Sequence, residues 1–529
     1  MDIDAVAQTS AAFVEHDQAR EWANVLAGLD PCPIRALPCA AMSEPTRETI
    51  YALSSGRPPA AIAVVRISGP CAGEALKTLA GKIPAPRKAS LARIRSRDGA
   101  IIDDALVLWF PGPHSETGED VAELQLHGGR AVVAAVLAAL SEVAGLRPAE
   151  AGEFTRRAFE NGKLDLTAVE GLADLVLAET EGQRRQAYRQ LTGALGNRAE
   201  NWRGQLIQAL ALVEARIDFS DEADVPQDLV TPALQIVRKL EGEIAAALAD
   251  GGRGERLREG LVVAIAGAPN AGKSTLLNRI AKREAAIVSP YAGTTRDVIE
   301  VHLDLGGLPV TLLDTAGIRE TDDPVEFEGV RRARERSAAA DLVFWVVDAS
   351  ELSTGRALLE AKKNRSVQRT WLIRNKVDLV QRDKGRNEYS NQNNRTNEFI
   401  VQTNEPFKSL VNEGLNKRNE FEFNSNELWF DVSATSGEGF EALLSQLGKY
   451  ATEFLAGVES TLVTRERHRR ALEDVLAALR RLLGSNVSGQ EDLLAEELHV
   501  AARALGRLTG RVDVEDVLDV IFRDFCIGK

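Results

Sequence analysis

The chain has few cysteines, and their arrangement argues against two kinds of protein. Its 529 residues include four cysteines whose spacing matches no metal-binding motif: Cys32, Cys39, Cys71 and Cys526. Small secreted domains held by disulfides need many more, whereas sparse cysteines are typical of a reducing compartment. We therefore expect a cytoplasmic protein whose cysteines bind no metal.

The chain also lacks long apolar runs and an excess of positive charge. No stretch of about 18 residues is free of charges and helix breakers, which argues against a transmembrane span or a membrane partner. The start, MDIDAVAQTSAAFVEHD, has no basic or apolar region typical of a secretion signal. Because the formal net charge is −14, RNA contact has to come from local basic patches. The densest are residues 183–203 and 464–470, on predicted helices where such charges more often form a solvated face.

The length suits about three or four domains, and 44% of the residues are hydrophobic. Strand and helix patterns alternate from Thr49 to about Lys163, and a helical pattern of apolar residues follows to about Glu255. The helical pattern returns at about Thr452. We therefore expect a multidomain α/β and α protein whose central α/β domain is inserted into one helical domain. The predicted segments are an extension (1–41), an α/β domain (42–163), a first helical segment (164–255), the inserted domain (256–451) and a second helical segment (452–529).

Two segments depart from this pattern. Residues 1–41 are alanine-rich without a clear strand pattern; we favour an upstream extension or misassigned start over a short interacting helix. Residues 386–426 contain eleven asparagines, and we expect a disordered surface insertion without a role in the chemistry.

The central domain carries a phosphate-binding signature. GAPNAGKS (267–274) follows the apolar run LVVAIA and precedes TLLNRI, which has helical character. In this strand–loop–helix context, loop N–H groups and the helix N-terminus point at a phosphate chain. We expect Lys273 to lie along the β- and γ-phosphates and the Ser274 hydroxyl to ligate Mg²⁺.

Four further segments follow in the order typical of a guanine-nucleotide switch. They are TTRD (294–297), DTAG (314–317), NKVD (375–378) and SAT (433–435). Asp314 can reach the metal through water, and the Asp378 carboxylate can accept two N–H donors that guanine has and adenine lacks. The signature predicts a Ras-like P-loop domain that binds GTP. Its predicted GTP-binding residues are Asn270, Ala271, Gly272, Lys273, Ser274, Thr275, Ser289, Thr294, Thr295, Asp314, Thr315, Ala316, Gly317, Asn375, Lys376, Asp378, Ser433 and Ala434.

The sequence identifies the catalytic groups less directly than the nucleotide-binding groups. Ile318 stands where many GTPases have a glutamine that orients water. Acidic residues of the following segment, among them Glu326, can take that role, although most are better explained as a solvated loop. Asn270 can hold a monovalent cation near the phosphates or simply stabilise the turn, and Arg296 is a weak arginine-finger candidate because Asp297 adjoins it.

Motifs spread over three domains resemble the tRNA modification GTPase family MnmE, also called TrmE. They include VVRISGP, GEDVAELQLHGG, FENGKLDL, GAPNAGKS, GTTRD, DTAG and the C-terminal FCIGK. The resemblance covers about residue 47 to 529, apart from the asparagine-rich insertion. It implies a homodimer that acts on tRNA with the FAD-dependent partner MnmG in a heterotetramer-type complex. The reaction modifies carbon 5 of a wobble uridine.

The resemblance also implies cofactors and their ligands. A tetrahydrofolate derivative, in the 5,10-methylene or 5-formyl form, would be bound by Arg66, Glu123, Lys163 and Lys529. Mg²⁺ would be held by Ser274 and Thr295, and K⁺ by Asn270, Ser289, Tyr291 and Thr294. Glu326 would be the catalytic carboxylate, and Cys526 would lie near the folate and the target base. A packed or frayed terminal thiol explains Cys526 about equally well.

Two alternatives lack one-carbon chemistry. A ribosome-assembly GTPase shares PNxGKS and an apolar residue after DTAG, but it predicts an added RNA-binding module that we do not find. The other is a regulatory switch that only binds partners. The N-terminal folate-like motifs and CIGK argue against both.

Overall fold

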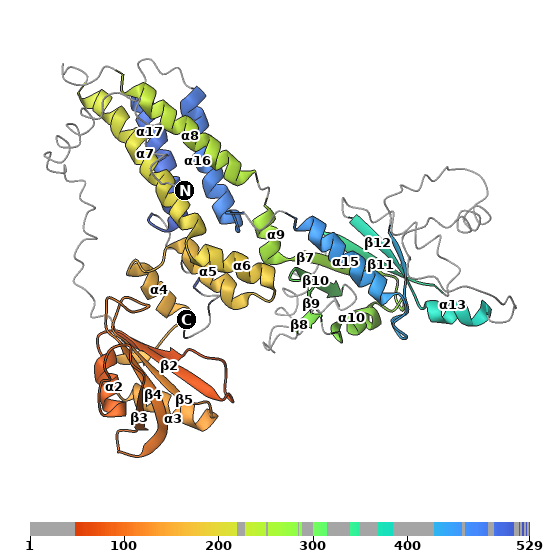
Figure 1. Cartoon of the computed structure of the whole chain (residues 1–529), viewed down its shortest axis with the longest axis horizontal. Coiled ribbons are helices and arrows are strands. Elements are labelled where there is room, and N and C mark those ends of the chain that lie inside the picture. Colours follow the sequence, from red (N-terminus) through yellow and green to blue (C-terminus); the bar gives the residue numbers. More distant parts are fainter. Residues whose placement is uncertain are drawn as a thin grey trace, which may run out of the picture. The chain divides into compact units, whose positions relative to one another are not determined.

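The computed structural model describes residues 48–219, 228–249, 252–283, 285–287, 300–314, 339–349, 369–384, 428–456, 461–484 and 491–512, and residues 518, 521, 522, 525 and 528 (Figure 1). The predictions for 1–41 and 386–426 lie outside these residues. The described chain forms two compact units. One contains the residues up to Phe154 together with Gly528, and the other contains the remaining residues from Thr155 onward.

The first unit is a six-stranded sheet covered by two helices, which confirms the predicted α/β domain. The strand order is β3-β4-β5-β2-β1-β6, and all neighbours are antiparallel except β1 and β6. The elements are β1 (Thr49–Leu53), β2 (Ile62–Ser68), α2 (Ala72–Ala80), β3 (Ser90–Arg95), β4 (Ile101–Phe110), β5 (Val121–His127), α3 (Arg130–Ser141) and β6 (Leu146–Pro148).

Alternation along β2 decides which side chains face the helices of this unit. Val65 and Ile67 are buried in one cluster with Leu76 of α2 and Leu140 of α3. Because successive residues of a strand point to opposite faces, Arg66 lies on the face away from these helices. That face therefore carries a charged group on a rigid strand.

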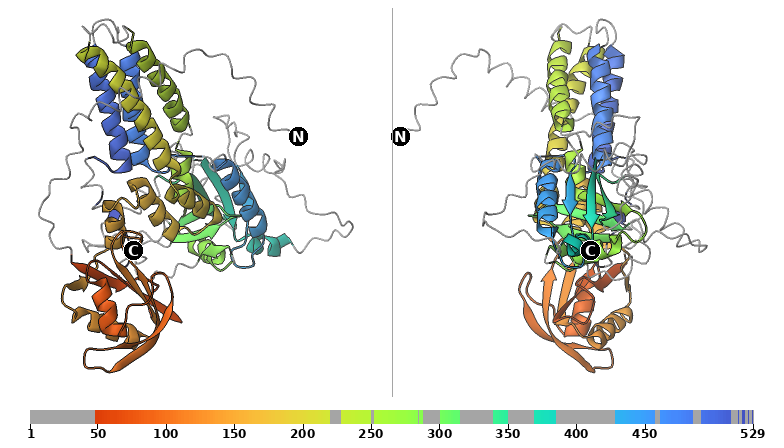
Figure 2. Two further views of the ribbon diagram at one scale, coloured as in Figure 1. Left: turned by 60° about the vertical axis from the view of Figure 1, so that its left-hand side comes forward. Right: turned by 90° about the vertical axis from the view of Figure 1, so that its right-hand side faces the viewer.

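In the helical portion of the second unit, α7, α8, α16 and α17 form a bundle (Figure 2). In it α7 packs on α8 and α17, and α16 also packs on α8 and α17. Their apolar residues share one core, whose members come from residues 195–247 and 463–508. This confirms one helical domain interrupted by the central domain. The helices here are α4 (Glu153–Glu160), α5 (Leu166–Leu177), α6 (Glu181–Leu191), α7 (Ala194–Asp218), α8 (Val230–Leu248), α9 (Arg253–Glu259), α16 (Glu466–Gly484) and α17 (Glu491–Thr509).

The two connections to the inserted domain lie against each other. A Cβ at Gly254 would stand 2.1 Å from the Val463 carbonyl oxygen and 2.7 Å from the Thr461 hydroxyl. Such distances are far below van der Waals contact, so only glycine fits at residue 254. The insertion therefore leaves and rejoins the helical domain at neighbouring points, as expected for an inserted domain.

A buried charged network fastens the start of α16 to α5. Arg467 forms two hydrogen bonds to Glu170, at 3.0 and 2.8 Å, and His468 Nε2 lies 2.6 Å from the same carboxylate. Burial opposes ionisation of Glu170, yet His468 and Arg467 hold its pKa below the ordinary value. Burial also lowers the pKa of His468. A neutral His468 that donates from Nε2 to an ionised Glu170 satisfies both groups.

This network corrects the expectation for residues 464–470, which we predicted to be a solvated basic face. Arg465 pairs with Asp174 at 2.6 Å and Arg469 with Glu255 at 3.2 Å, while Arg470 pairs with Glu466. A run of basic residues in the sequence does not show whether acidic side chains from other helices pair with them. Arg465, Arg467 and Arg469 therefore join the start of α16 to α5 and α9, whereas Arg470 is exposed and pairs within α16.

The inserted domain is a seven-stranded sheet with the order β13-β12-β11-β7-β10-β9-β8. The five strands from β13 to β10 are parallel, while β9 and β8 extend the sheet antiparallel. Helices α10 and α15 contribute to its core. The elements are β7 (Leu261–Gly267), α10 (Lys273–Ala281), β8 (Ala286–Ile287), β9 (Glu300–Asp304), β10 (Pro309–Asp314), β11 (Leu342–Asp348), β12 (Arg369–Asn375), α13 (Val377–Lys384), β13 (Trp429–Asp431) and α15 (Phe440–Phe454).

Among the residues that the structure describes, we find no helix with the length and apolarity needed to cross a membrane.

Candidate functional site

The phosphate loop joins β7 to α10 at the carboxyl edge of the parallel strands, where α/β sheets bind ligands. Gly267 ends β7 with φ +143°, and a Cβ there would stand 2.1 Å from the Val346 carbonyl oxygen. Gly272 precedes α10 in the left-handed conformation, and Asn270 also has a positive φ of 63°. Asparagine tolerates this conformation better than most residues. The loop therefore presents its backbone to a ligand without side-chain obstruction from either glycine.

Lys273 and Ser274 begin α10 from this loop. The Lys273 ammonium donates to the carbonyl oxygens of Gly267 at 2.9 Å and of Ala268 at 2.8 Å. Burial lowers the pKa of Lys273, and the nearby Asp314 carboxylate opposes that shift. The side chain is thus folded over the loop, where a phosphate chain would meet its charge.

A pair of oxygen donors lies beside the loop. The Ser274 hydroxyl donates to Asp314 Oδ2 at 2.9 Å, which joins the start of α10 to the end of β10. Hydroxyl and carboxylate oxygens are the ligands that Mg²⁺ prefers, with water completing its shell. These two residues fit the predicted magnesium site. Thr275 follows Ser274 in α10 and is exposed.

Asn375, at the end of β12, connects three loops. Its amide nitrogen donates to the Ala271 carbonyl oxygen at 2.9 Å, and its amide oxygen accepts from the Ala434 N–H at 2.9 Å. A Cβ at Gly272 would stand 2.3 Å from the same amide nitrogen, so glycine is required there too. The structure therefore brings the predicted NKVD, SAT and phosphate-loop motifs together.

The remaining base-site residues surround this connection. Lys376 has a positive φ of 67° and its ammonium contacts Asp348 Oδ2 at 2.6 Å. Asp378 lies in the first turn of α13, half-buried. The Ser433 hydroxyl is buried and accepts from the Ser436 N–H at 3.0 Å. The Asp378 carboxylate is thus carried by a short helix, next to a loop that the Ser433–Ser436 hydrogen bond holds in shape.

Two supporting residues were missed by the sequence reasoning. Asp348 ends the apolar strand β11, and its position after such a strand is a signal that could have identified it. Arg279 on α10 donates to the carbonyl oxygens of Thr435 at 2.8 Å and Ser436 at 2.9 Å. No local pattern marks Arg279, because its partners are more than 150 residues away.

A second charged site lies on the first unit, on the sheet face away from α2 and α3. Arg66 donates to Glu123 of the neighbouring strand at 3.0 Å and pairs with Glu116 at 2.8 Å. Its guanidinium stands 5.8 Å from the centre of the Phe154 ring. The structure thus brings together two of the predicted folate residues, and Glu116 is a third charge that the sequence did not point to.

The C-terminal segment also reaches this unit. A Cβ at Gly528 would stand 2.2 Å from the Leu53 carbonyl oxygen, so this glycine packs directly on the end of β1. Ala52, beside Leu53, is the cross-strand partner of Arg66. Gly528 therefore lies at the end of β1, the strand next to the one that carries Arg66.

Lys163 lies in the turn after α4, where its N–H donates to the Ala158 carbonyl oxygen at 2.8 Å, and it belongs to the second unit. Ten predicted site residues lie outside the described residues: Ser289, Tyr291, Thr294, Thr295, Thr315, Ala316, Gly317, Glu326, Cys526 and Lys529.

The glycine loop, the Ser274–Asp314 oxygen pair and the NKVD loop, all at one sheet edge, define a P-loop GTPase. Comparison of the whole chain with family models defines a narrower class of protein. Residues 166–526 match the family model described as the MnmE helical domain, and residues 49–163 match that of the GTP-binding protein TrmE N-terminus. The chain belongs to the MnmE family of tRNA modification GTPases, as its motifs predicted.

Similar proteins span nearly the same length. The tRNA modification GTPase MnmE of Rhodopseudomonas palustris (strain BisB18) is 54% identical over 485 residues, which cover 91% of this chain and 99% of that protein. The MnmE protein of Bradyrhizobium sp. (strain ORS 278) is 55% identical over 485 residues, covering 92% and 100%. The similarity therefore extends over all the domains of these relatives.

Proposed function

We propose that this GTPase modifies carbon 5 of the wobble uridine in tRNA, using a tetrahydrofolate one-carbon donor and acting as a cytoplasmic homodimer with the FAD-dependent partner MnmG. The group added is aminomethyl or carboxymethylaminomethyl. The observation that carries the proposal is the charged site around Arg66, in a chain that also has the motifs of a GTP site.

The Arg66 site suits a folate. Its guanidinium can bind a glutamate carboxylate of the cofactor, and the Glu123 and Glu116 carboxylates can accept N–H donors of the pterin ring. In the tetrahydrofolate form, 5,10-methylene or 5-formyl, the cofactor supplies the one-carbon unit. Placement of Gly528 on the end of β1 supports a role for the neighbouring Cys526 and Lys529 at this site.

GTP hydrolysis is proposed to need two cations. Mg²⁺ would be held by Ser274 and Thr295, and K⁺ by Asn270, Ser289, Tyr291 and Thr294, with Glu326 acting on the attacking water. Potassium would supply the positive charge that an arginine finger provides elsewhere. Asn270 fits because it is exposed in the phosphate loop and its side chain carries an amide oxygen that can bind a cation.

The direct test is mass spectrometry of wobble uridines from a strain that lacks this gene, with and without the gene restored. Modification should disappear and return with the wild-type gene. Unchanged wobble uridines in the deletion strain would favour a ribosome-assembly or purely regulatory GTPase.

A binding experiment tests the folate site. Titration of the full-length protein with 5-formyltetrahydrofolate should show at least tenfold weaker binding for Arg66→Gln, roughly the cost of a lost charge-assisted pair. Arg93→Gln is a matched control, because Arg93 lies on β3 of the same sheet and pairs with Asp104 at 3.0 Å. Equal affinity of wild type and Arg66→Gln would remove Arg66 from the site.

A further inference from the structure

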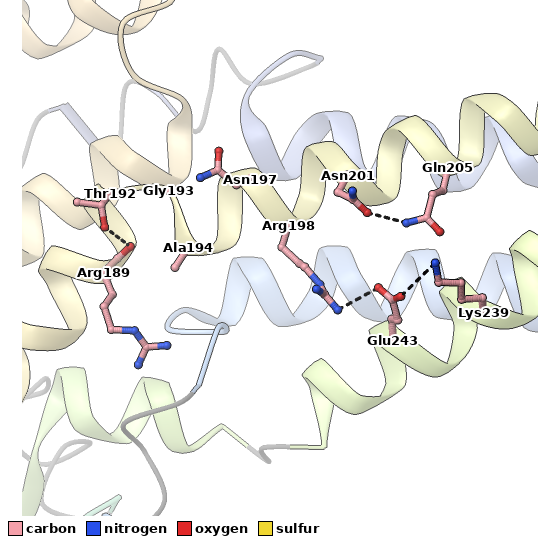
Figure 3. Close-up of a pocket in the computed structure, with 10 residues that line it drawn as sticks. All are labelled: Arg189, Thr192, Gly193, Ala194, Asn197, Arg198, Asn201, Gln205, Lys239 and Glu243. Atoms are coloured by element: carbon pink, nitrogen blue, oxygen red, sulfur yellow. Dashed lines mark hydrogen bonds and ion pairs between the residues drawn. The ribbon is translucent and has the colours of Figure 1, made fainter. Parts of the chain in front are cut away.

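An open groove of about 600 Å³ lies on the helical domain, between the end of α6, one side of α7 and α8 (Figure 3). It takes part in none of the sites described above. Figure 3 shows Arg189 from α6 and Arg198 from α7 extending in the same direction. Lys239 of α8 lines the same groove. Cationic side chains from three helices therefore line the groove.

The groove side of α7 is built from hydrogen-bond donors. Asn197, Arg198, Asn201 and Gln205 line it, and their spacing of three and four residues places them on one helix face. The other side of α7 contributes Leu195, Ala199, Trp202 and Leu206 to the bundle core. Packing thus fixes the helix, and the donor face is directed outward along about 12 Å of helix.

The positive charge of the groove is only partly neutralised. Glu243 is the one carboxylate among its lining residues, and it accepts from Arg198 at 3.0 Å, from the Trp202 indole N–H at 2.9 Å, and lies 4.0 Å from Lys239. Arg189 makes no ion pair with any described residue. Three cations against one carboxylate leave a local excess of positive charge in a chain whose net charge is −14.

The other basic stretch of the sequence offers no such surface. Arg465, Arg467, Arg469 and Arg470 are all engaged by carboxylates of the protein itself. Of the two densest basic stretches, residues 183–203 contribute to this groove and residues 464–470 do not line it.

We propose that this groove binds the phosphodiester backbone of the tRNA substrate. Arginine and lysine neutralise phosphates, while asparagine and glutamine amides donate to phosphate and ribose oxygens. In a protein of net negative charge, a local basic groove is a surface that attracts RNA electrostatically. The inference rests on the family's action on tRNA but not on its one-carbon chemistry.

The test compares two double variants of the full-length protein. Arg189→Gln with Lys239→Gln removes two groove charges. Arg184→Gln with Arg185→Gln removes two charges from α6 outside the groove, where both arginines pair with Glu181 at 2.7 Å. Binding of fluorescein-labelled tRNA is measured by anisotropy between about 50 and 200 mM KCl, the range over which phosphate contacts show their salt dependence.

We expect the groove variant to bind about tenfold more weakly, with the slope of log K against log [KCl] reduced by about 1 to 2. The α6 control should bind like wild type. The same affinity and slope in the groove variant, equal loss in the control, or no tRNA binding by wild type would each overturn the proposal. Equal GTP turnover and melting temperature would show that all variants are folded.

Two further readouts separate this inference from the proposed function. If wobble uridines are unaffected by gene deletion while the groove variant still binds tRNA poorly, the groove stands and the one-carbon proposal falls. If the groove variant keeps tRNA binding but loses association with the purified FAD-dependent partner, the groove binds protein and the RNA assignment is wrong.

Discussion

The side-chain amide of Asn375 donates to the Ala271 carbonyl oxygen at 2.9 Å, which joins the NKVD loop directly to the phosphate loop. The same side chain accepts from the Ala434 N–H, and it is only 1% exposed. One buried amide therefore holds the NKVD, SAT and phosphate loops together.

Asn375→Ala should weaken GTP binding without changing base preference. It leaves the Ala271 carbonyl and the Ala434 N–H without their partner, and each such loss costs about 1–3 kcal/mol when buried. We expect at least a tenfold rise in the Kd for GTP and a lower melting temperature. Calorimetric titration and thermal unfolding measure these; wild-type values for both would contradict the proposed linkage.

Asp378→Asn should change which base is preferred. If Asp378 reads the base, its carboxylate would accept the two N–H donors of guanine, whereas an amide placed there would meet the extra carbonyl of xanthine. We expect weaker GTP binding and tighter xanthosine triphosphate binding, measured by competition titration. Asn375→Ala serves as the comparison, because it should weaken both nucleotides together. An unchanged ratio in Asp378→Asn would mean that Asp378 does not read the base.

Potassium should accelerate GTP turnover relative to sodium at equal ionic strength, with association of two nucleotide-binding domains. Asn270→Ala and Asn270→Gly should both abolish the difference, since both remove the amide oxygen. Glycine keeps the positive φ observed at residue 270, so it separates cation binding from loop shape. Should Asn270→Gly retain the potassium response, Asn270 is only a turn residue.

Glu326→Ala and Cys526→Ser should have opposite effects. Loss of Glu326 should slow GTP hydrolysis by about 10²–10⁴-fold with GTP affinity nearly intact, the usual effect of removing a group that acts on water. Cys526→Ser should keep GTP hydrolysis and abolish wobble-uridine modification, because a hydroxyl is a poorer nucleophile at neutral pH. Full modification by Cys526→Ser would make this cysteine a packing residue, and lost GTP affinity in Glu326→Ala would make Glu326 structural.

The helical domain should lose stability as the pH falls below about 6.5. Burial lowers the pKa of His468, so the unfolded chain binds a proton there that the folded domain does not. The free energy of unfolding then falls by up to about 1.4 kcal/mol per pH unit until the folded pKa is reached. Glu170, whose folded pKa is also lowered, contributes stability above about pH 4.3 that is lost at lower pH.

Calorimetry of His468→Gln across this range tests the expectation. Glutamine can still donate to Glu170 but takes up no proton, so the pH dependence between about 6.5 and 5 should become flatter. His499→Gln is the control, because His499 is half exposed on α17 and pairs with Glu214 at 3.4 Å. An unchanged slope in His468→Gln would assign the acid sensitivity to other groups.

Local pattern was sufficient to predict most of the fold and the meeting of the phosphate-loop, NKVD and SAT motifs at one sheet edge. Apolar periodicity identified the strands that end at Gly267, Asp314 and Asn375. The motifs after them come together because the carboxyl ends of parallel strands share one sheet edge. The contacts between distant segments were not accessible. Arg279 reaches the loop at Thr435, and Arg467 reaches Glu170, through packing that no short window of sequence contains.

The divided bundle has a consequence for how the protein is made on the ribosome. More than 200 residues separate the end of α8 at Leu248 from the start of α16 at Glu466. At roughly 5–20 residues per second, synthesis of this interval takes on the order of 10–40 s. During that time α7 and α8 expose half of an apolar core to solvent, while the inserted sheet can fold because its core lies within residues 261–454. The apolar faces of α7 and α8 are therefore the surfaces that a chaperone would protect during synthesis. In a chain truncated before α16 these faces would stay exposed permanently.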